Sequence, residues 1–155
     1  MPSAKKKRSA KARQSDFKFF ETLRVRYAEV DPQGIVFNAH YLTYLDVAIT
    51  EYFRARTGQS YNDLVIAHGI DFHVQQSLVD YHSSARFDDV LQIGVRGSYR
   101  GARIVWQLAI FRGSELVCSA RLTYAGVESS TAKRGGVKRI PRGLAASLDL
   151  ARTED

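Results

Sequence analysis

Apolar and polar positions recur with two different periods along the chain. In residues 38–57 the apolar side chains return every three or four positions, which predicts a long helix with one apolar face. An earlier segment, residues 17–27, alternates loosely and predicts a first strand. Four later segments have the length and alternation of strands: residues 72–81, 90–99, 103–112 and 116–127.

Short turn sequences join the later segments. Turn-forming residues stand between them at Asp88-Asp89, Arg100-Gly101 and Gly113-Ser114. Strands joined so closely pair as an antiparallel meander. The order strand, long helix, antiparallel strands therefore predicts an α+β fold with the helix packed on one face of the sheet. The other face is half apolar, so we expect it to meet a second copy of the chain.

Composition and charge add a domain boundary. The chain has 155 residues, 45% of them hydrophobic, and a single cysteine, Cys118, which predicts one globular domain without disulfides and a buried, inert thiol. Residues 1–13 carry six Lys and Arg and no acid, which leaves +1 of the net charge of +7 for the remainder. We therefore expect a disordered basic arm over residues 1–15 and a folded domain over residues 16–150. The arm is a solubilising tail or, alternatively, the one segment suited to bind nucleic acid.

Missing motifs exclude several classes of enzyme. The sequence has no phosphate-binding loop, no dinucleotide-binding glycine pattern, no GxSxG and no HExxH. Cys or His pairs at metal-ligand spacing are also missing, so we expect no metal and no cofactor. Neither a membrane-spanning apolar run nor a signal peptide is found, which predicts a cytoplasmic protein.

The main candidate chemistry lies between the first strand and the long helix. Asp31 opens a turn sequence that ends at Gly34, and it stands seven residues before Asn38, the expected N-cap of the helix. The N–H groups of a helix N-terminus suit an oxyanion, and a nearby carboxylate can attack a thioester or deprotonate a water molecule. The same residues also form an ordinary turn in which Asp31 only caps the loop, and both interpretations stay open.

This segment resembles the signature of the 4-hydroxybenzoyl-CoA thioesterase family, the acyl-CoA thioesterases of the hot-dog fold. The shared pattern is Asp-x-x-Gly, two apolar residues, an aromatic residue and a later Tyr, and it is matched by Asp31, Gly34, Ile35, Val36, Phe37 and Tyr41. A second block, residues 86–93, resembles the family's entry into its third strand. The resemblance spans residues 17–127. It implies an antiparallel sheet of about five strands wrapped around a long central helix.

The resemblance also implies an activity and a set of site residues. The activity is hydrolysis of an acyl- or aryl-CoA to the free acid and CoA, with Asp31 as nucleophile or general base. The Asn38 N–H takes the role of oxyanion stabiliser, and Gly34 allows the close turn between the two. Coenzyme A is expected along the interface of a homodimer or homotetramer. The residues expected to contact substrate or CoA are Tyr41, His73, Val74, Arg100 and Arg103, the two arginines at its phosphates.

Other interpretations remain beside this one. A non-catalytic acyl-CoA-binding module with a nucleic-acid-binding arm would have the same fold, although it would have no need of Asp31. A hot-dog dehydratase would require a histidine in a different local pattern. His40 stands two residues after Asn38 and therefore points to another side of the helix, so it is not expected to take the Asn38 role. Asp46, further along the helix, is expected to be exposed or capped.

Overall fold

Six strands and three α-helices make up the computed structural model, which describes residues 10–130 and 135–154. Residues 1–9 of the expected arm lie outside this range. The sheet has the order β1-β3-β4-β5-β2 with antiparallel neighbours, and a short β6 runs parallel to β3. The strands are β1 Phe20–Arg24, β2 Ile70–Tyr81, β3 Val90–Arg100, β4 Arg103–Arg112, β5 Glu115–Glu128 and β6 Ala151–Arg152, and the helices are α1 His40–Thr57, α2 Tyr61–His68 and α3 Arg142–Ser147.

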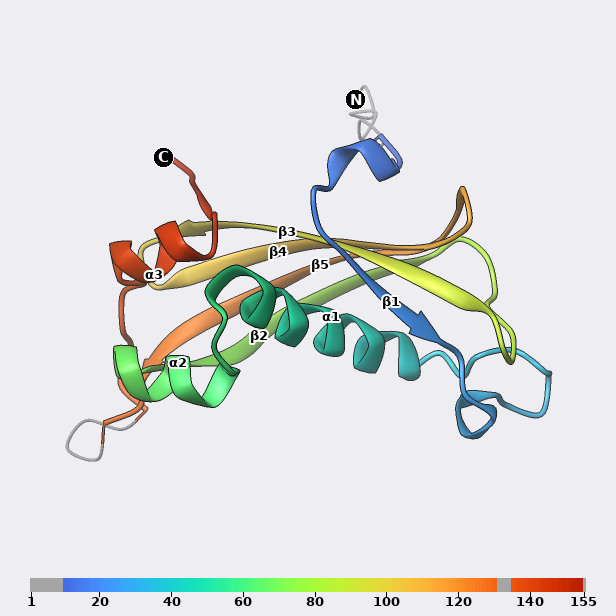
Figure 1. Cartoon of the computed structure of the whole chain (residues 1–155), viewed down its shortest axis with the longest axis horizontal. Coiled ribbons are helices and arrows are strands. Elements are labelled where there is room, and N and C mark those ends of the chain that lie inside the picture. Colours follow the sequence, from blue (N-terminus) through green and yellow to red (C-terminus); the bar gives the residue numbers. More distant parts are fainter. Residues whose placement is uncertain (1–9, 131–134, 155) are drawn as a thin grey trace, which may run out of the picture.

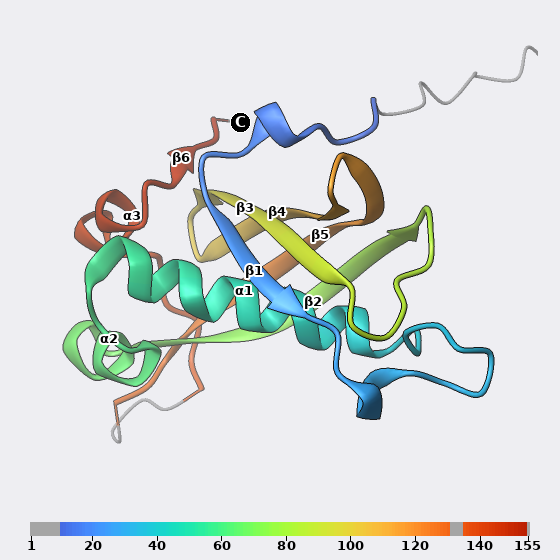
Figure 2. The same ribbon diagram turned by 45° about the vertical axis from the view of Figure 1, so that its right-hand side comes forward.

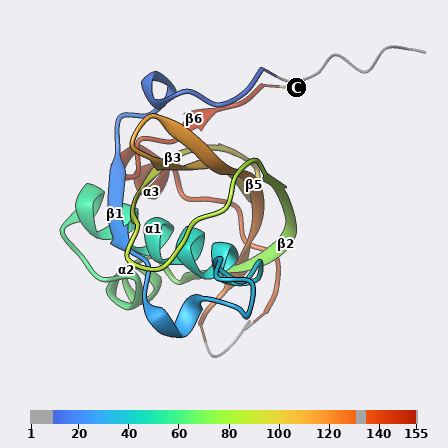
Figure 3. The same cartoon turned by 90° about the vertical axis from the view of Figure 1, so that its right-hand side faces the viewer.

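The sheet curls around α1, as the end-on view shows (Figure 3). This arrangement confirms the predicted α+β hot-dog fold. The predicted meander holds for β3, β4 and β5, but it is wrong for β2, which pairs with β5 and not with β3, the next strand in the chain. The helix buries its apolar face against the concave side of the sheet, where Trp106 packs edge-to-face on Tyr52 and Phe53 with ring centroids 5.5 and 5.8 Å apart. Gly58 ends the helix in the left-handed conformation, with φ of 71°. The buried residues of α1 are Tyr41, Tyr44, Leu45, Ala48, Ile49, Tyr52 and Phe53.

The helix begins later than predicted. Its first residue is His40 and its N-cap is Ala39, which has no side chain able to cap, so the prediction of Asn38 as N-cap is wrong. The chain enters the helix through a turn in which the His40 N–H donates to the Phe37 carbonyl at 2.9 Å. Asn38 therefore lies in the turn that leads into α1, and its carbonyl accepts the Tyr41 N–H at 3.4 Å.

The convex side of the sheet carries a small second cluster of apolar side chains. Phe17, expected in the first strand, instead packs edge-to-face on Phe20 and Phe111 across this side, so β1 starts only at Phe20. Just before it, the Gln14 side-chain amide donates to the Gly113 carbonyl at 2.7 Å. The end of the expected arm that the structure describes is thus packed against the sheet.

The C-terminal segment folds back over the β3–β4 turn. The Ile140 N–H donates to the Gly101 carbonyl at 2.8 Å, and the Thr153 N–H donates to the Tyr99 carbonyl at 3.1 Å. Gly101 has a φ of 58°, a left-handed conformation that this tight turn requires. In Figures 1 and 2, α3 and the described C-terminus lie at one end of the molecule, and the turn that precedes α1 lies at the other.

Candidate active site

Asp31 lies in a tight turn between β1 and α1. The Asp31 N–H donates to the Ile35 carbonyl at 2.8 Å, and the Gly34 N–H donates back to the Asp31 carbonyl at 2.9 Å. Gly34 has a φ of 76°, which explains the glycine at this position. One carboxylate oxygen, Oδ1, accepts the Gln33 N–H at 2.8 Å, so Asp31 does cap its turn. Within the described residues Oδ2 accepts no hydrogen bond, which leaves one oxygen for chemistry.

The start of α1 lies beside this turn. Among the described residues no acceptor is bound to the Asn38 N–H. The Asn38 carbonyl accepts the hydroxyl of Tyr81, the last residue of β2, at 3.2 Å. The structure therefore brings Asp31, Gly34 and Asn38 to one end of the helix, with an unoccupied backbone donor among them.

Tyr41 joins the start of α1 to the loop that contains Ala85. Its ring is buried, and its hydroxyl accepts the N–H of Ala85, whose carbonyl accepts the Val36 N–H at 2.8 Å. Tyr81, whose ring centroid lies 5.5 Å from that of Tyr41, is 53% exposed at the same place. Tyr81 is thus an exposed aromatic side chain beside Asn38. The sequence signals for it were its aromatic ring and its position at the end of a predicted strand.

Glu29, two residues before Asp31, is the one buried charged side chain that the described residues contain, at 4% exposure. Its carboxylate accepts the Arg26 N–H at 2.7 Å and the Arg26 guanidinium at 3.1 Å, while its carbonyl accepts the Phe37 N–H at 3.0 Å. Burial acts to raise the pKa of Glu29, but the hydrogen bonds from Arg26 outweigh it and leave the pKa lowered. The sequence analysis missed this residue, which ties both sides of the Asp31 turn together.

His73 and Val74 are neighbours on β2 and face opposite sides of the sheet. Val74 lines a cavity of about 240 Å³ on the side of α1. His73 is exposed and pairs with Ala125, which in turn pairs with Arg103, so these three residues share the convex side. The two residues therefore do not line one cleft. The cavity beside Val74 is also lined by Asp46, Ile49, Thr50, Phe53, Tyr61, Phe72 and Tyr124.

Arg100 and Arg103 lie far from Asp31 in the same chain. They flank the β3–β4 turn, beside the start of β2, whereas Tyr81 at the end of β2 contacts Asn38. Eight strand positions from His73 to Tyr81 span roughly 26 Å. Both arginines line a groove of about 650 Å³ with Gln75 and Arg121. One chain thus places the carboxylate and the arginines at opposite ends.

Cys118 is fully buried, and burial raises the pKa of its thiol to about 12, which agrees with the predicted inert role. In the part of the chain that the structure describes, no three His, Cys, Asp or Glu side chains gather as metal ligands would. None of the helices described is both long and apolar enough to span a membrane.

Comparison with known proteins gives one consistent family. Residues 33–119 match the model of the thioesterase superfamily. The acyl-CoA thioesterase YbgC of Haemophilus influenzae is 29% identical over 107 residues, which are 68% of this chain and 78% of that protein. A probable thioesterase of Bartonella henselae is 26% identical, with a TM-score of 0.69 over 79% of this chain and 98% of its own. The DHNA-CoA thioesterase of Staphylococcus aureus is 25% identical, with a TM-score of 0.66 over 78% of each chain.

Proposed function

The chain belongs to the thioesterase superfamily, and we propose that it hydrolyses the thioester bond of an acyl- or aryl-CoA with Asp31 as its catalytic residue. The observation that carries the assignment is that the segment leading into α1 holds both the Asp31 carboxylate, whose Oδ2 accepts no hydrogen bond within the described residues, and the Asn38 N–H, which donates none there. A carboxylate next to an available backbone donor is what acyl transfer through an oxyanion needs. A protein that only bound acyl-CoA would gain nothing from this pair.

The chemistry divides between the two groups. Asp31 Oδ2 takes a proton from water, whose oxygen attacks the thioester carbon, or Oδ2 attacks that carbon itself to give an anhydride that water then opens. In both routes the carbonyl oxygen gains negative charge, and the Asn38 N–H donates to it. The carbon–sulfur bond then breaks and CoA leaves as the thiolate. In the first route the thiolate takes up the proton that Asp31 accepted from water, and in the second it takes up a proton from the water that opens the anhydride. The hydrogen bond from the Gln33 N–H to Oδ1 restrains the carboxylate and leaves Oδ2 for the reaction.

We further propose that the working enzyme is a homo-oligomer whose basic unit is a homodimer. Strand β2 lies at the edge of the sheet, and its exposed apolar side chains include Val74, Leu78 and Tyr81. If the β2 edges of two copies pair antiparallel about a two-fold axis, the start of one β2 comes beside the end of the other. The Arg100–Arg103 turn of one copy would then lie at the Asp31 end of its partner, where CoA phosphates could reach it.

Thiol release from a panel of acyl-CoAs, with short, long, branched and aromatic acyl groups, tests the proposal. Asp31→Asn keeps the size and the turn but removes the base, so we expect kcat to fall about 10²- to 10⁴-fold with an unchanged fold. Asp63→Asn, which removes an exposed carboxylate on α2, serves as the matched control and should keep the parental rate.

Two outcomes would contradict the proposal. Parental turnover in Asp31→Asn would remove Asp31 from the reaction. No turnover with any thioester by the folded wild type, together with retained CoA binding, would favour the non-catalytic binding module.

A further inference from the structure

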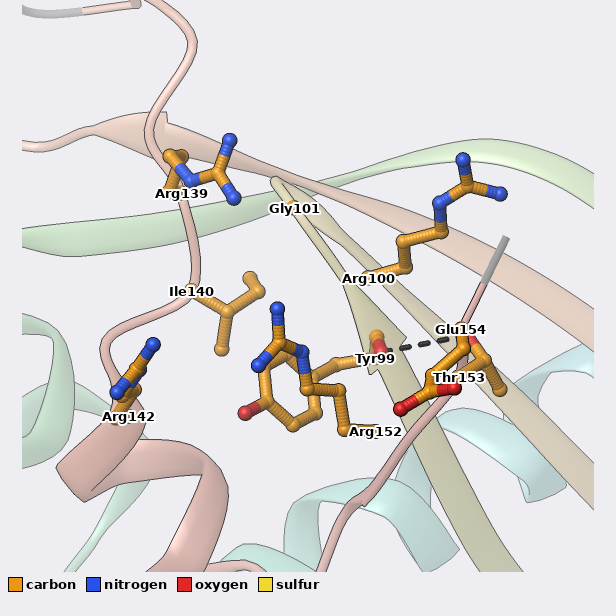
Figure 4. A pocket seen from close by; sticks show the side chains of 9 residues that line it. All are labelled: Tyr99, Arg100, Gly101, Arg139, Ile140, Arg142, Arg152, Thr153 and Glu154. Carbon is orange, nitrogen blue, oxygen red and sulfur yellow. Dashed lines mark hydrogen bonds between the residues drawn. The ribbon is translucent and has the colours of Figure 1, made fainter.

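A second cleft lies behind the β3–β4 turn, on the side of the C-terminal segment (Figure 4). Its volume of about 620 Å³ is in the range of small-molecule sites. Figure 4 shows arginines entering from three segments: Arg100 from the turn, Arg139 and Arg142 from the start of α3 and the residues before it, and Arg152 from β6. The remaining lining residues are Tyr99, Gly101, Ile140, Thr153 and Glu154.

Backbone hydrogen bonds fix the walls of this cleft. The Ile140 N–H bonds to the Gly101 carbonyl, which holds the Arg139–Arg142 segment against the turn. On the other wall β6 pairs Arg152 with Tyr99, and the Thr153 N–H bonds to the Tyr99 carbonyl. The arginines therefore stand on backbone that is held at defined positions. They are not side chains of a loose tail.

Three of the arginines in the cleft carry positive charge that no described residue pairs with. Arg139, Arg142 and Arg152 are exposed, and no described residue forms an ion pair or hydrogen bond with their guanidinium groups. Glu154 is the one acid among the nine lining residues. Like charges held together in a concave site repel one another and concentrate anions from solution. An anionic ligand would relieve that repulsion.

We propose that this cleft binds the phosphate groups of a nucleotide. A guanidinium group can bind two phosphate oxygens at once, and three of these groups line one cleft here. The Tyr99 ring and Ile140 lie among them and offer an apolar surface that suits a base or ribose. Arg139, Arg142 and Arg152 all lie outside residues 33–119, so the family match does not account for them. With the proposed function as its premise, the ligand is the 3′-phosphoadenosine diphosphate end of CoA.

Equilibrium binding of adenosine 3′,5′-bisphosphate, measured by calorimetry, tests the site without any turnover. The double variant Arg142→Gln/Arg152→Gln should bind this nucleotide about 10- to 100-fold more weakly than wild type. The control Lys11→Gln/Arg54→Gln loses the same charge at exposed positions outside the cleft and should bind as wild type does. Inorganic pyrophosphate, as a second probe, should bind more weakly than the nucleotide.

Kinetics then separate this site from the catalytic proposal. The double variant should raise KM for an acyl-CoA and leave kcat unchanged, and it should leave both constants unchanged for the acyl-pantetheine thioester, which lacks the nucleotide. Equal nucleotide binding by the double variant and its control would overturn the inference even if acyl-CoA is hydrolysed. Pyrophosphate binding as tight as the nucleotide would also overturn it. If the wild type hydrolyses no thioester but binds the nucleotide, and the double variant loses that binding, the proposed nucleotide site stands and the thioesterase proposal is rejected.

Discussion

The two ends of the molecule are built in different ways. At the Asp31 end, the hydrogen bonds that close the turn join residues close in sequence, such as Asp31 to Ile35 and Glu29 to Phe37, and a bond from Val36 to Ala85 then ties the turn to a distant loop. At the arginine end, the bonds join segments dozens of residues apart, such as Ile140 to Gly101. The Asp31 turn itself is closed by local backbone bonds. The arginine end exists only while the C-terminal segment is docked on the β3–β4 turn, so one substitution can remove it and leave the Asp31 turn.

Gly126→Ala is expected to have the largest effect, because it should disturb the arginine end and leave the Asp31 end intact. A Cβ at Gly126 would lie 2.4 Å from the Lys138 carbonyl oxygen and 2.9 Å from the Ile70 side chain, and the backbone of the C-terminal segment must move to make room. We expect a loss of about 1–3 kcal/mol in the free energy of unfolding, typical of overpacking, and a loss of nucleotide binding in the cleft. Urea denaturation and calorimetry measure the two effects.

Gly143→Ala is the matched control, since its Cβ meets nothing within 4 Å in the first turns of α3. It should leave both stability and nucleotide binding close to wild type. Turnover of an acyl-pantetheine should survive in both glycine variants, because the Asp31 turn does not contact the displaced segment. If Gly126→Ala abolished that turnover while remaining folded, the two ends would be coupled and could not be treated as independent.

Arg112→Met probes the Asp31 end in the same way. Arg112 is 29% exposed and bonds Asp89 and Glu115 at 2.7 Å each, and the carbonyl of Ser84 at 2.9 Å. It thereby holds the loop in which Ala85 forms hydrogen bonds with both Val36 and Tyr41. We expect a loss of about 1–2 kcal/mol in stability and a lower kcat, with nucleotide binding in the cleft unchanged.

An exposed ion pair provides the reference for this measurement. Arg24 and Asp88 bond at 3.1 Å with both side chains more than 60% exposed, so Arg24→Met should cost about 0.5 kcal/mol or less. Denaturation curves of the two variants, taken with their acyl-CoA kinetics, give the contrast. A stability loss in Arg112→Met no larger than that of Arg24→Met would show that the loop is held by its backbone alone.

The difference between local and long-range contacts also explains which features the sequence could predict. The strand and helix pattern follows from local periodicity, so residues 103–112 were predicted with the bounds that β4 has. The Asp31 turn was also within reach, because a turn sequence and a helix start stood next to each other. Only the helix start was misplaced, since Asn38 is a good N-cap in isolation but the Phe37–His40 turn excludes it.

Side-chain placement across distant segments was not within reach of the sequence. The prediction had His73 and Val74 both contact substrate or CoA, and strand alternation places these neighbours on opposite sides of the sheet. The sequence analysis assigned no role to Arg139, Arg142 or Arg152. The pairing of β6 with β3, which brings Arg152 beside Tyr99, is parallel and two residues long. No local sequence pattern predicts such a contact.

Glu29→Gln is the mildest test, and it concerns how firmly the Asp31 turn is held. The substitution keeps the shape of a buried acceptor but removes the charge that Arg26 stabilises, so we expect a loss of about 1 kcal/mol near neutral pH. The pKa of Glu29 is lowered in the folded protein from an ordinary value of 4.5. The carboxylate therefore adds stability above pH 4.5 and loses it as pH falls through the lowered pKa.

The difference in unfolding free energy between wild type and Glu29→Gln should accordingly be full at pH 7 and shrink steadily below pH 4.5. Urea denaturation at a series of pH values from 7 to 3 measures it. A difference that stays constant over this range would mean that the amide disturbs packing and that the Arg26–Glu29 charge pair contributes nothing. In that case the Asp31 turn would be stabilised by its hydrogen bonds without help from an ion pair, among them those that Asp31, Val36 and Phe37 donate.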